Sequence, residues 1–88
     1  MAEPPYISRS ACRHGVTSND IELVLDDPSH VLSLSDIAAI GLGDPERPNV
    51  IVYAGYDIAN NPLVVFVDRF ENIAFHSEPG RRRFSWLF

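Results

Sequence analysis

The sequence predicts an α+β protein in which two short N-terminal helices pack on a three- to four-stranded antiparallel β-sheet. Three runs rich in β-branched and aromatic residues follow one another at 49–56, 63–68 and 72–77. Short connections separate these runs, as in an antiparallel meander. The residues before them carry helix-start and helix-stop signals instead. Because strands follow helices along the chain, the α+β class is favoured over an alternating α/β fold.

The three runs differ in strength, and a weaker run precedes them. Asn60-Asn61-Pro62 lies between the first two runs, where asparagine tolerates left-handed backbone and proline ends strand pairing. Residues 30–34 alternate well enough to form a fourth strand. Both faces of the strands are apolar, so we expect both faces of the sheet to be covered.

The first helix is predicted over residues 9–14. Ser8 can cap its start, and Gly15 suits the left-handed position at which a helix ends. A helix of this length is marginal in isolation and has to be stabilised by packing.

The second helix has stronger signals. Thr17 and Asp20 have the spacing of a capping box. Ile21, Val24 and Leu25 then fall at positions i, i+3 and i+4, which place one apolar stripe on a helix. A proline soon after the stripe ends the helix.

The length of 88 residues allows one domain, spanning 1–88. Residues 1–6 are expected to be poorly ordered, and residues 81–88 form a basic and aromatic C-terminal tail. No apolar run is long enough to span a bilayer and no secretory leader is apparent, so a cytoplasmic protein with no membrane partner is expected. A single cysteine, Cys12, excludes an internal disulfide and a cysteine-based zinc site. No motif indicates a metal or a cofactor.

The net charge of −5 is unevenly distributed. The chain has seven arginines, no lysine and twelve acidic residues. Three of the arginines are Arg81, Arg82 and Arg83, so residues 1–80 have a balance of −8 and the tail adds +3. This asymmetry can steer an anionic ligand to one end of the molecule, or it can bind an acidic protein partner.

His76 is the histidine whose position best suits acid–base chemistry. It lies near the end of the last predicted strand, two residues before Glu78 and therefore on the same face. With arginines close behind, it can act as acid or base on a phosphodiester. The alternative is a partly buried histidine whose hydrogen bonding is satisfied by Glu78.

Several arginines can hold phosphate. Arg47 precedes the first strand of the meander, and Arg69 lies in the turn that follows the second. Both are candidates for the same catalytic site as His76, and both can equally be solvated turn residues. In the tail, Arg81–Arg83 followed by Trp86 combine charge with a stacking surface, a pairing that single-stranded nucleic acid uses; a solvated tail is the alternative.

The chain resembles small BrnT-type toxins of the RelE-like group from bacterial toxin–antitoxin operons. The resemblance is carried by Arg13-His-Gly-Val16, a closing Asp27-Pro28, Gly55-Tyr-Asp57 and the run 62–67, and it extends over roughly residues 9–78. Arg47 matches the arginine that leads into a strand in that family. Where the family has a catalytic arginine segment, this chain has 74–79, and His76 is the replacement there.

The resemblance implies a metal-independent endoribonuclease that acts on free or ribosome-associated RNA, halts growth and is neutralised by a cognate antitoxin. A homodimer is also compatible with the apolar tail. The alternative function is a non-catalytic interaction or inhibitor module that keeps the toxin-like fold and binds its partner through the acidic surface or the tail.

Overall fold

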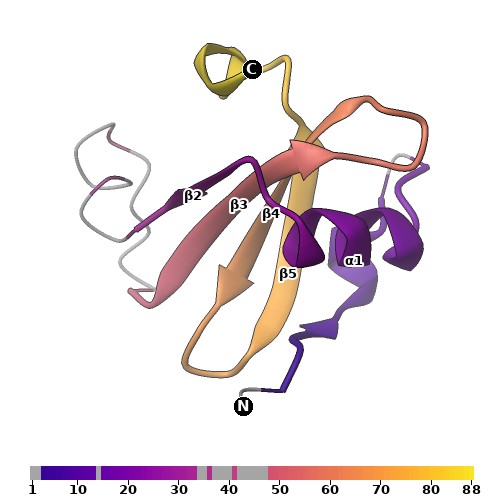
Figure 1. Ribbon diagram of the computed structural model, residues 1–88. Coiled ribbons are helices and arrows are strands. Elements are labelled where there is room, and N and C mark those ends of the chain that lie inside the picture. The colour runs from indigo at the N-terminus through magenta and orange to yellow at the C-terminus, as the bar shows by residue number, and fades with distance from the viewer. Residues whose placement is uncertain (1–2, 14, 34–35, 37–40, 42–47) are drawn as a thin grey trace.

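In the part of the chain that the structure describes, a five-stranded mixed β-sheet has the helix α1 across one face (Figure 1). A computed structural model of the chain describes residues 3–13, 15–33, 36, 41 and 48–88. The spatial strand order is β1-β5-β4-β3-β2. The strands are β1 (Tyr6–Ile7), β2 (His30–Leu32), β3 (Val50–Tyr56), β4 (Pro62–Asp68) and β5 (Ile73–Pro79); the helix is α1 (Ser18–Asp26), and two 3-10 turns are η1 (Arg9–Ala11) and η2 (Ser85–Leu87).

The prediction of two N-terminal helices on a three- to four-stranded antiparallel sheet is wrong. The described part of the chain has a single α-helix and five strands, and it contains more sheet than helix. The fifth strand is β1, in which Tyr6 pairs with Ile73 in parallel orientation. Tyr6 ends the stretch that was expected to be poorly ordered, and its N–H donates to the carbonyl of Asn72 at 2.9 Å.

Residues 9–13, the described part of the predicted first helix, do not form an α-helix because this segment is bonded to the sheet. The Ser8 N–H and hydroxyl both donate to the Ala74 carbonyl on β5, and the Ser10 hydroxyl donates to the Phe75 carbonyl. Serine hydroxyls that bond carbonyls elsewhere compete with the helical backbone pattern. The segment therefore makes only the 3-10 turn η1.

Helix α1 begins as its sequence predicts. The Thr17 hydroxyl accepts from the Asp20 N–H at 3.2 Å, and the Asp20 carboxylate accepts from the Thr17 N–H at 3.0 Å. This reciprocal pair satisfies two backbone donors at the helix start. The second oxygen of Asp20 accepts from the Ile58 N–H at 3.2 Å, which ties the helix to the β3–β4 turn.

The three-stranded centre of the sheet agrees with the predicted meander. β3 pairs with β4, and β4 with β5, both antiparallel. The two turns contain Asn60 and Asn72 at φ 64° and 57°, a left-handed conformation that asparagine adopts more readily than most residues. Opposite Phe66 and Val67 the register shifts, so β5 contains one extra residue, Phe75.

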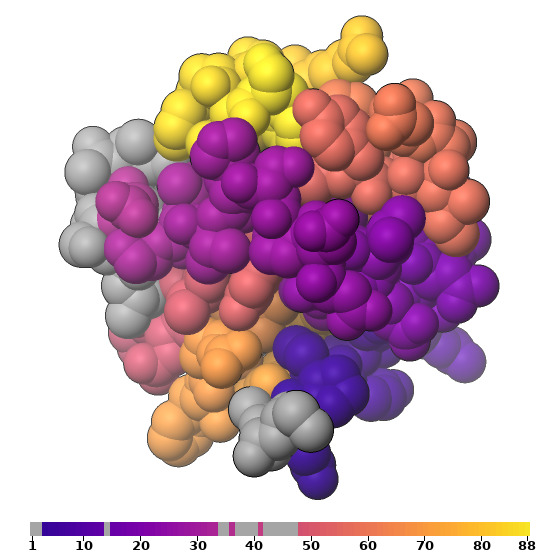
Figure 2. Space-filling model, in the orientation of Figure 1, coloured from indigo at the N-terminus to yellow at the C-terminus, as the bar shows by residue number. Residues whose placement is uncertain are grey.

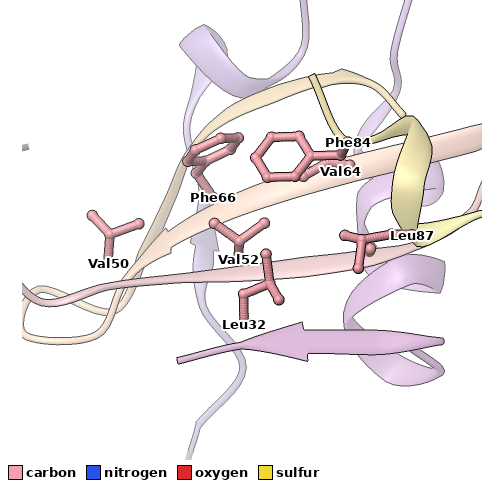
Figure 3. Close-up of a cluster of buried hydrophobic side chains, with 8 residues drawn as sticks. Leu32, Val50, Val52, Val64, Phe66, Phe84 and Leu87 are labelled. Atoms are coloured by element: carbon pink, nitrogen blue, oxygen red, sulfur yellow. The ribbon is translucent and has the colours of Figure 1, made fainter. Parts of the chain in front are cut away.

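The two faces of the sheet bury separate apolar clusters. The helix face lies under α1 and η1, and its buried residues are Ala11, Ile21, Val24, Leu63, Val65, Val67 and Ala74. The tail face lies under the C-terminal tail, and its buried residues are Leu32, Val50, Val52, Ala54, Val64, Phe66, Phe84 and Leu87. Figure 3 shows Phe84 and Leu87 of the tail directed toward side chains of this sheet face. Both faces are covered, as the apolar strands predict.

Candidate functional site

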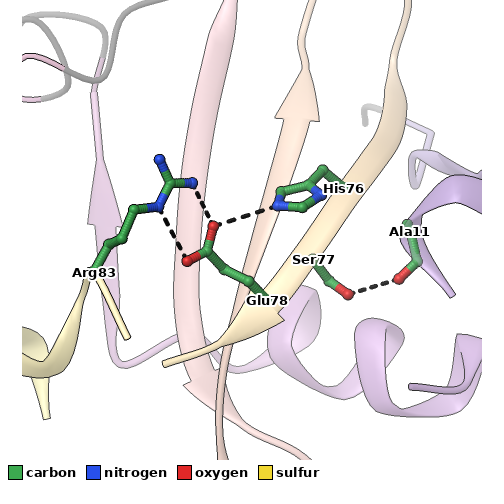
Figure 4. A network of polar contacts seen from close by, with 5 residues as sticks. All are labelled: Ala11, His76, Ser77, Glu78 and Arg83. Atoms are coloured by element: carbon green, nitrogen blue, oxygen red, sulfur yellow. Dashed lines mark hydrogen bonds and ion pairs between the residues drawn. The ribbon is translucent and has the colours of Figure 1, made fainter. Parts of the chain in front are cut away.

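The candidate site is built on the last residues of β5. His76 lies opposite Phe66 and Glu78 opposite Val64 in the β4–β5 register. Because alternate residues of a strand share a face, both side chains project on the tail face, while Ser77 between them projects on the helix face. The Ser77 hydroxyl donates to the Ala11 carbonyl at 2.6 Å, which fixes the strand from its other side (Figure 4).

Glu78 is the centre of a three-residue network. One of its carboxylate oxygens accepts from Arg83 Nε at 3.2 Å, and the other is bonded to the terminal nitrogen Nη2 of the same guanidinium. This bidentate arrangement is the strongest geometry for an arginine–carboxylate pair. The His76 Nε2 lies 3.3 Å from the oxygen that also contacts Nη2, as Figure 4 shows. The Glu78 side chain is only 8% exposed, whereas those of His76 and Arg83 are about half exposed.

These contacts fix the charge state of the network. Burial raises the pKa of Glu78, but the hydrogen bonds and charge of Arg83, with a further contribution from His76, lower it more strongly. The net result is a Glu78 pKa below its ordinary value, and the bond to Glu78 raises the pKa of Arg83. At neutral pH the two side chains are therefore a charged pair, and Glu78 largely neutralises the positive charge of Arg83.

His76 is held in position but remains accessible. Its ring lies against Phe66 with centroids 5.0 Å apart, and Glu78 fixes one ring nitrogen. It lines a cavity of about 270 Å³ together with Arg82 and Arg83. A histidine oriented by a carboxylate and open on its other side is the arrangement that general acid–base catalysis requires.

Of the other two predicted catalytic residues, Arg69 is described by the structure and is not part of this network. Arg69 lies three residues beyond Phe66 along the chain, about 10 Å further in the strand direction. Its guanidinium donates to the hydroxyl of Tyr53, a residue of the helix-face cluster, at 3.3 Å. Arg47 lies outside the described residues. The structure therefore brings His76 together with Arg82 and Arg83, and it places Arg69 elsewhere.

The three consecutive arginines at the start of the tail have different neighbours. Arg83 is bonded to Glu78, Arg82 lines the His76 cavity, and Arg81 lines two further cavities beside the β3–β4 turn. Trp86 is 57% exposed, and its indole N–H donates to the Arg83 carbonyl at 3.1 Å. The predicted RNA-binding set is thus spread over one end of the molecule.

Sequence reasoning did not predict Tyr56, Asn60 and Phe88 as site residues. They share a cavity with Arg81 although they come from β3, the β3–β4 turn and the end of the tail. Their only sequence signal is the asparagine-rich turn, which predicts a local conformation and no partner. The contact between the turn and the tail depends on the tertiary structure.

The described residues contain neither a metal-binding cluster nor a membrane-spanning helix. Within the described ranges, no group of three or more His, Cys, Asp or Glu side chains is placed to hold a metal ion. Among those same residues, no helix has the length and apolar character that crossing a membrane requires. Cys12 is half-buried and its thiol is free.

No protein-family model, curated protein or solved structure matches the chain in comparisons with known proteins. The resemblance to BrnT-type toxins therefore stays a prediction from sequence.

Proposed function

We propose that this chain is a growth-inhibiting toxin that cleaves RNA without a metal ion, with His76 as its acid–base residue. The observation that carries the proposal is the position of His76, which is bonded to the ionised Glu78 and lines a cavity with Arg82. A histidine in this setting can exchange protons with a substrate, and a nearby arginine can stabilise charge on a phosphate.

In the proposed reaction, the 2′-hydroxyl of a ribose attacks the adjacent phosphodiester of the RNA. His76 takes the proton of a 2′-hydroxyl, whose oxygen then forms a bond to the adjacent phosphorus while the bond from phosphorus to the 5′-oxygen breaks. His76 returns its proton to the leaving 5′-oxygen, so the products are a cyclic phosphate and a free 5′-hydroxyl. Arg82 contacts the phosphate during this exchange, and Glu78 holds the imidazole through Nε2.

The geometry changes the roles assigned from sequence. Arg83 serves as a positioning residue, because its guanidinium is occupied by Glu78. Arg82 takes the phosphate-binding role, and Arg69 has no part in the chemistry. Arg47 remains a candidate phosphate ligand from its position before the first strand of the meander and from the resemblance. The proposed partners are RNA and a neutralising antitoxin, and the proposed compartment is the cytoplasm.

A second candidate function is a non-catalytic interaction module. The observation that favours it is the acidic outer surface of α1, where Glu22 and Asp26 are exposed beside the exposed Leu23. A surface of this kind suits a basic protein partner. In that case the His76–Glu78–Arg83 network has only the structural role of holding the tail on the sheet.

The test is RNA cleavage by the purified protein in the presence of EDTA, together with growth of a bacterial culture after induction. His76→Ala is expected to lower the cleavage rate by about 100-fold or more, the usual contribution of an acid–base residue, and to abolish growth arrest. His30→Ala is the matched control, because His30 is an exposed histidine on β2. Circular dichroism checks that both variants are folded.

The outcomes separate the two candidates. Cleavage that survives His76→Ala contradicts the proposed mechanism. A folded parent protein that neither cleaves RNA nor arrests growth supports the interaction module instead.

A further inference from the structure

The surface around Arg81 is a second site, distinct from the His76 cavity. Arg81 borders two adjoining cavities of about 420 and 440 Å³, and both also touch Pro62. Arg81 is exposed and forms no ion pair with any residue that the structure describes. Its charge is therefore available, in contrast to that of Arg83. In Figure 2 the C-terminal tail, in yellow, lies against the β3–β4 turn, in salmon.

The larger cavity has the groups that recognise a nucleotide. It is lined by Tyr56, Asn60, Pro62, Arg81, Ser85 and Phe88. Tyr56 and Phe88 make an edge-to-face pair with centroids 5.5 Å apart, and both remain more than a third exposed. Such rings offer a stacking surface for a base, and a guanidinium forms paired hydrogen bonds with a phosphate.

Two polar side chains of this cavity have unused hydrogen-bonding groups. Neither the Asn60 amide nor the Ser85 hydroxyl forms a hydrogen bond with another described residue. An amide presents a donor and an acceptor together, and asparagine uses both to read the edge of a base. The volume of about 440 Å³ lies in the range of small-molecule sites.

Charge decides which of the two cavities takes the anionic ligand. The smaller cavity contains the carboxylates Asp20 and Asp57, which repel a phosphate. No carboxylate side chain lines the larger cavity. Arg81 stands between them, so a phosphate held by Arg81 is favoured on the side of Tyr56 and Phe88.

We propose that the cavity formed by Arg81, Tyr56, Asn60 and Phe88 binds one nucleotide of a single-stranded RNA. Arg81 holds a phosphate, the aromatic pair contacts the base, and Asn60 bonds to the edge of that base. This inference rests on the proposed function, since Arg82, the next residue along, lines the His76 cavity. The strand then runs from the nucleotide site to the site of cleavage.

The experiment measures binding without cleavage. The probe is a single-stranded pentanucleotide with 2′-O-methyl riboses, which lacks the hydroxyl that the cleavage reaction needs. Trp86 is the only tryptophan of the chain and lies in the tail, so its fluorescence reports binding. Arg81→Gln is expected to weaken binding by about tenfold or more, as for a lost charge-assisted hydrogen bond. The slope of the logarithm of the binding constant against the logarithm of the salt concentration should also become less steep by about 0.7.

Two further variants test the specificity of the site. Asn60→Gly removes the amide without backbone strain, because Asn60 already has a φ of 64° that glycine adopts freely. It is expected to reduce discrimination among the four bases while phosphate binding remains. Arg9→Gln removes the same charge from η1, on the helix face, and should change affinity less than twofold.

Each outcome bears on one proposal. Equal binding by the parent and Arg81→Gln overturns the inference, and so does inorganic phosphate that competes as well as a mononucleotide. Binding that requires Arg81, in a protein that cleaves no RNA, supports the nucleotide site and contradicts the proposed reaction. Cleavage that is unaffected by Arg81→Gln, with unchanged affinity, supports the reaction and contradicts the site.

Discussion

The two faces of the sheet are covered by different kinds of structure. On the helix face, α1 contributes Ile21 and Val24, both fully buried, and its backbone hydrogen bonds are internal to the helix. On the tail face, the cover is an eight-residue tail with a single 3-10 turn, in which Phe84 is fully buried. The tail is additionally held by the bond between Arg83 and Glu78.

This difference shows which face of the sheet is more firmly covered and which face has the two candidate sites. Helix α1 is supported by its cap, by its contacts with β3 and by close approach at Gly55, where an added Cβ would lie 3.4 Å from Val24. The tail is held by two buried side chains, Phe84 and Leu87, by the ring contact of Phe88 with Tyr56 and by one ion pair. Segments with few buried contacts open at lower free energy than the rest of a domain. Arg81 and Arg82, the arginines proposed to bind phosphate, belong to the tail, which is the less firmly held of the two segments that cover the sheet.

The largest effect is expected from Phe84→Ala. The Phe84 ring is fully buried and lies 5.8 Å from that of Phe66, so its removal leaves a cavity on the tail face. The expected loss is about 3–5 kcal/mol in the free energy of unfolding, measured by urea denaturation. Trp86→Ala is the matched control within the tail. Because the indole is exposed, its removal should lower the free energy of unfolding by less than about 1 kcal/mol.

If Phe84→Ala is too unstable to measure, a smaller change at the same position still tests the contribution of the tail to stability. Phe84→Leu keeps most of the apolar volume and should cost about 1–2 kcal/mol. Equal stability of the Phe84 and Trp86 variants would mean that the tail does not contribute to the core.

The sequence predicts those parts of the fold that depend on neighbouring residues. The cap of α1 requires only Thr17 and Asp20, which are three positions apart, and the central strands follow from their β-branched composition. The predicted first helix failed because Ser8 and Ser10 bond to carbonyls 66 and 65 positions later. Local patterns contain no information about such partners, and the same is true of the parallel pairing of β1.

The candidate site was predictable to a similar extent. Strand alternation places His76 and Glu78 on one face, and the structure brings them to 3.3 Å. The divergence of Arg81, Arg82 and Arg83 could not be predicted, because the chain after β5 has no regular period. For the same reason the sequence suggested one basic patch. In the structure Arg83 is paired with Glu78, whereas Arg81 and Arg82 form no ion pair with another described residue.

A smaller effect, with a distinct pH dependence, is expected from Glu78→Gln. The pKa of Glu78 is lower in the folded protein than its ordinary value of 4.5. Its ionisation therefore stabilises the fold at pH values above about 4.5, and this contribution is lost as the pH falls through the lowered pKa. At pH 7 the variant should lose about 1–2 kcal/mol, less than for a fully buried pair because Arg83 is half exposed.

The measurement is the free energy of unfolding of both proteins between pH 7 and pH 3. The difference between them should be largest near neutral pH and should shrink below pH 4.5 as Glu78 takes up a proton. His76, which contacts Glu78, and the neighbouring Arg82 are present in both proteins, so the comparison isolates the carboxylate. Glu71→Gln removes the same charge from an exposed turn position, and a pH dependence equal to that of Glu78→Gln would contradict the assignment.

The smallest effect is expected in a double variant that combines a change in helix α1 with a change that affects the tail on the opposite face of the sheet. Thr17→Ala removes the cap of α1 and should cost about 1 kcal/mol. Thr17 contacts the helix start, whereas Glu78 contacts the tail on the opposite face of the sheet, and they share no partner. The two losses should therefore add in the double variant Thr17→Ala/Glu78→Gln, with a coupling below about 0.5 kcal/mol by urea denaturation. A larger coupling would mean that the strands transmit strain between the faces, so that the helix also sets the position of the arginines in the tail.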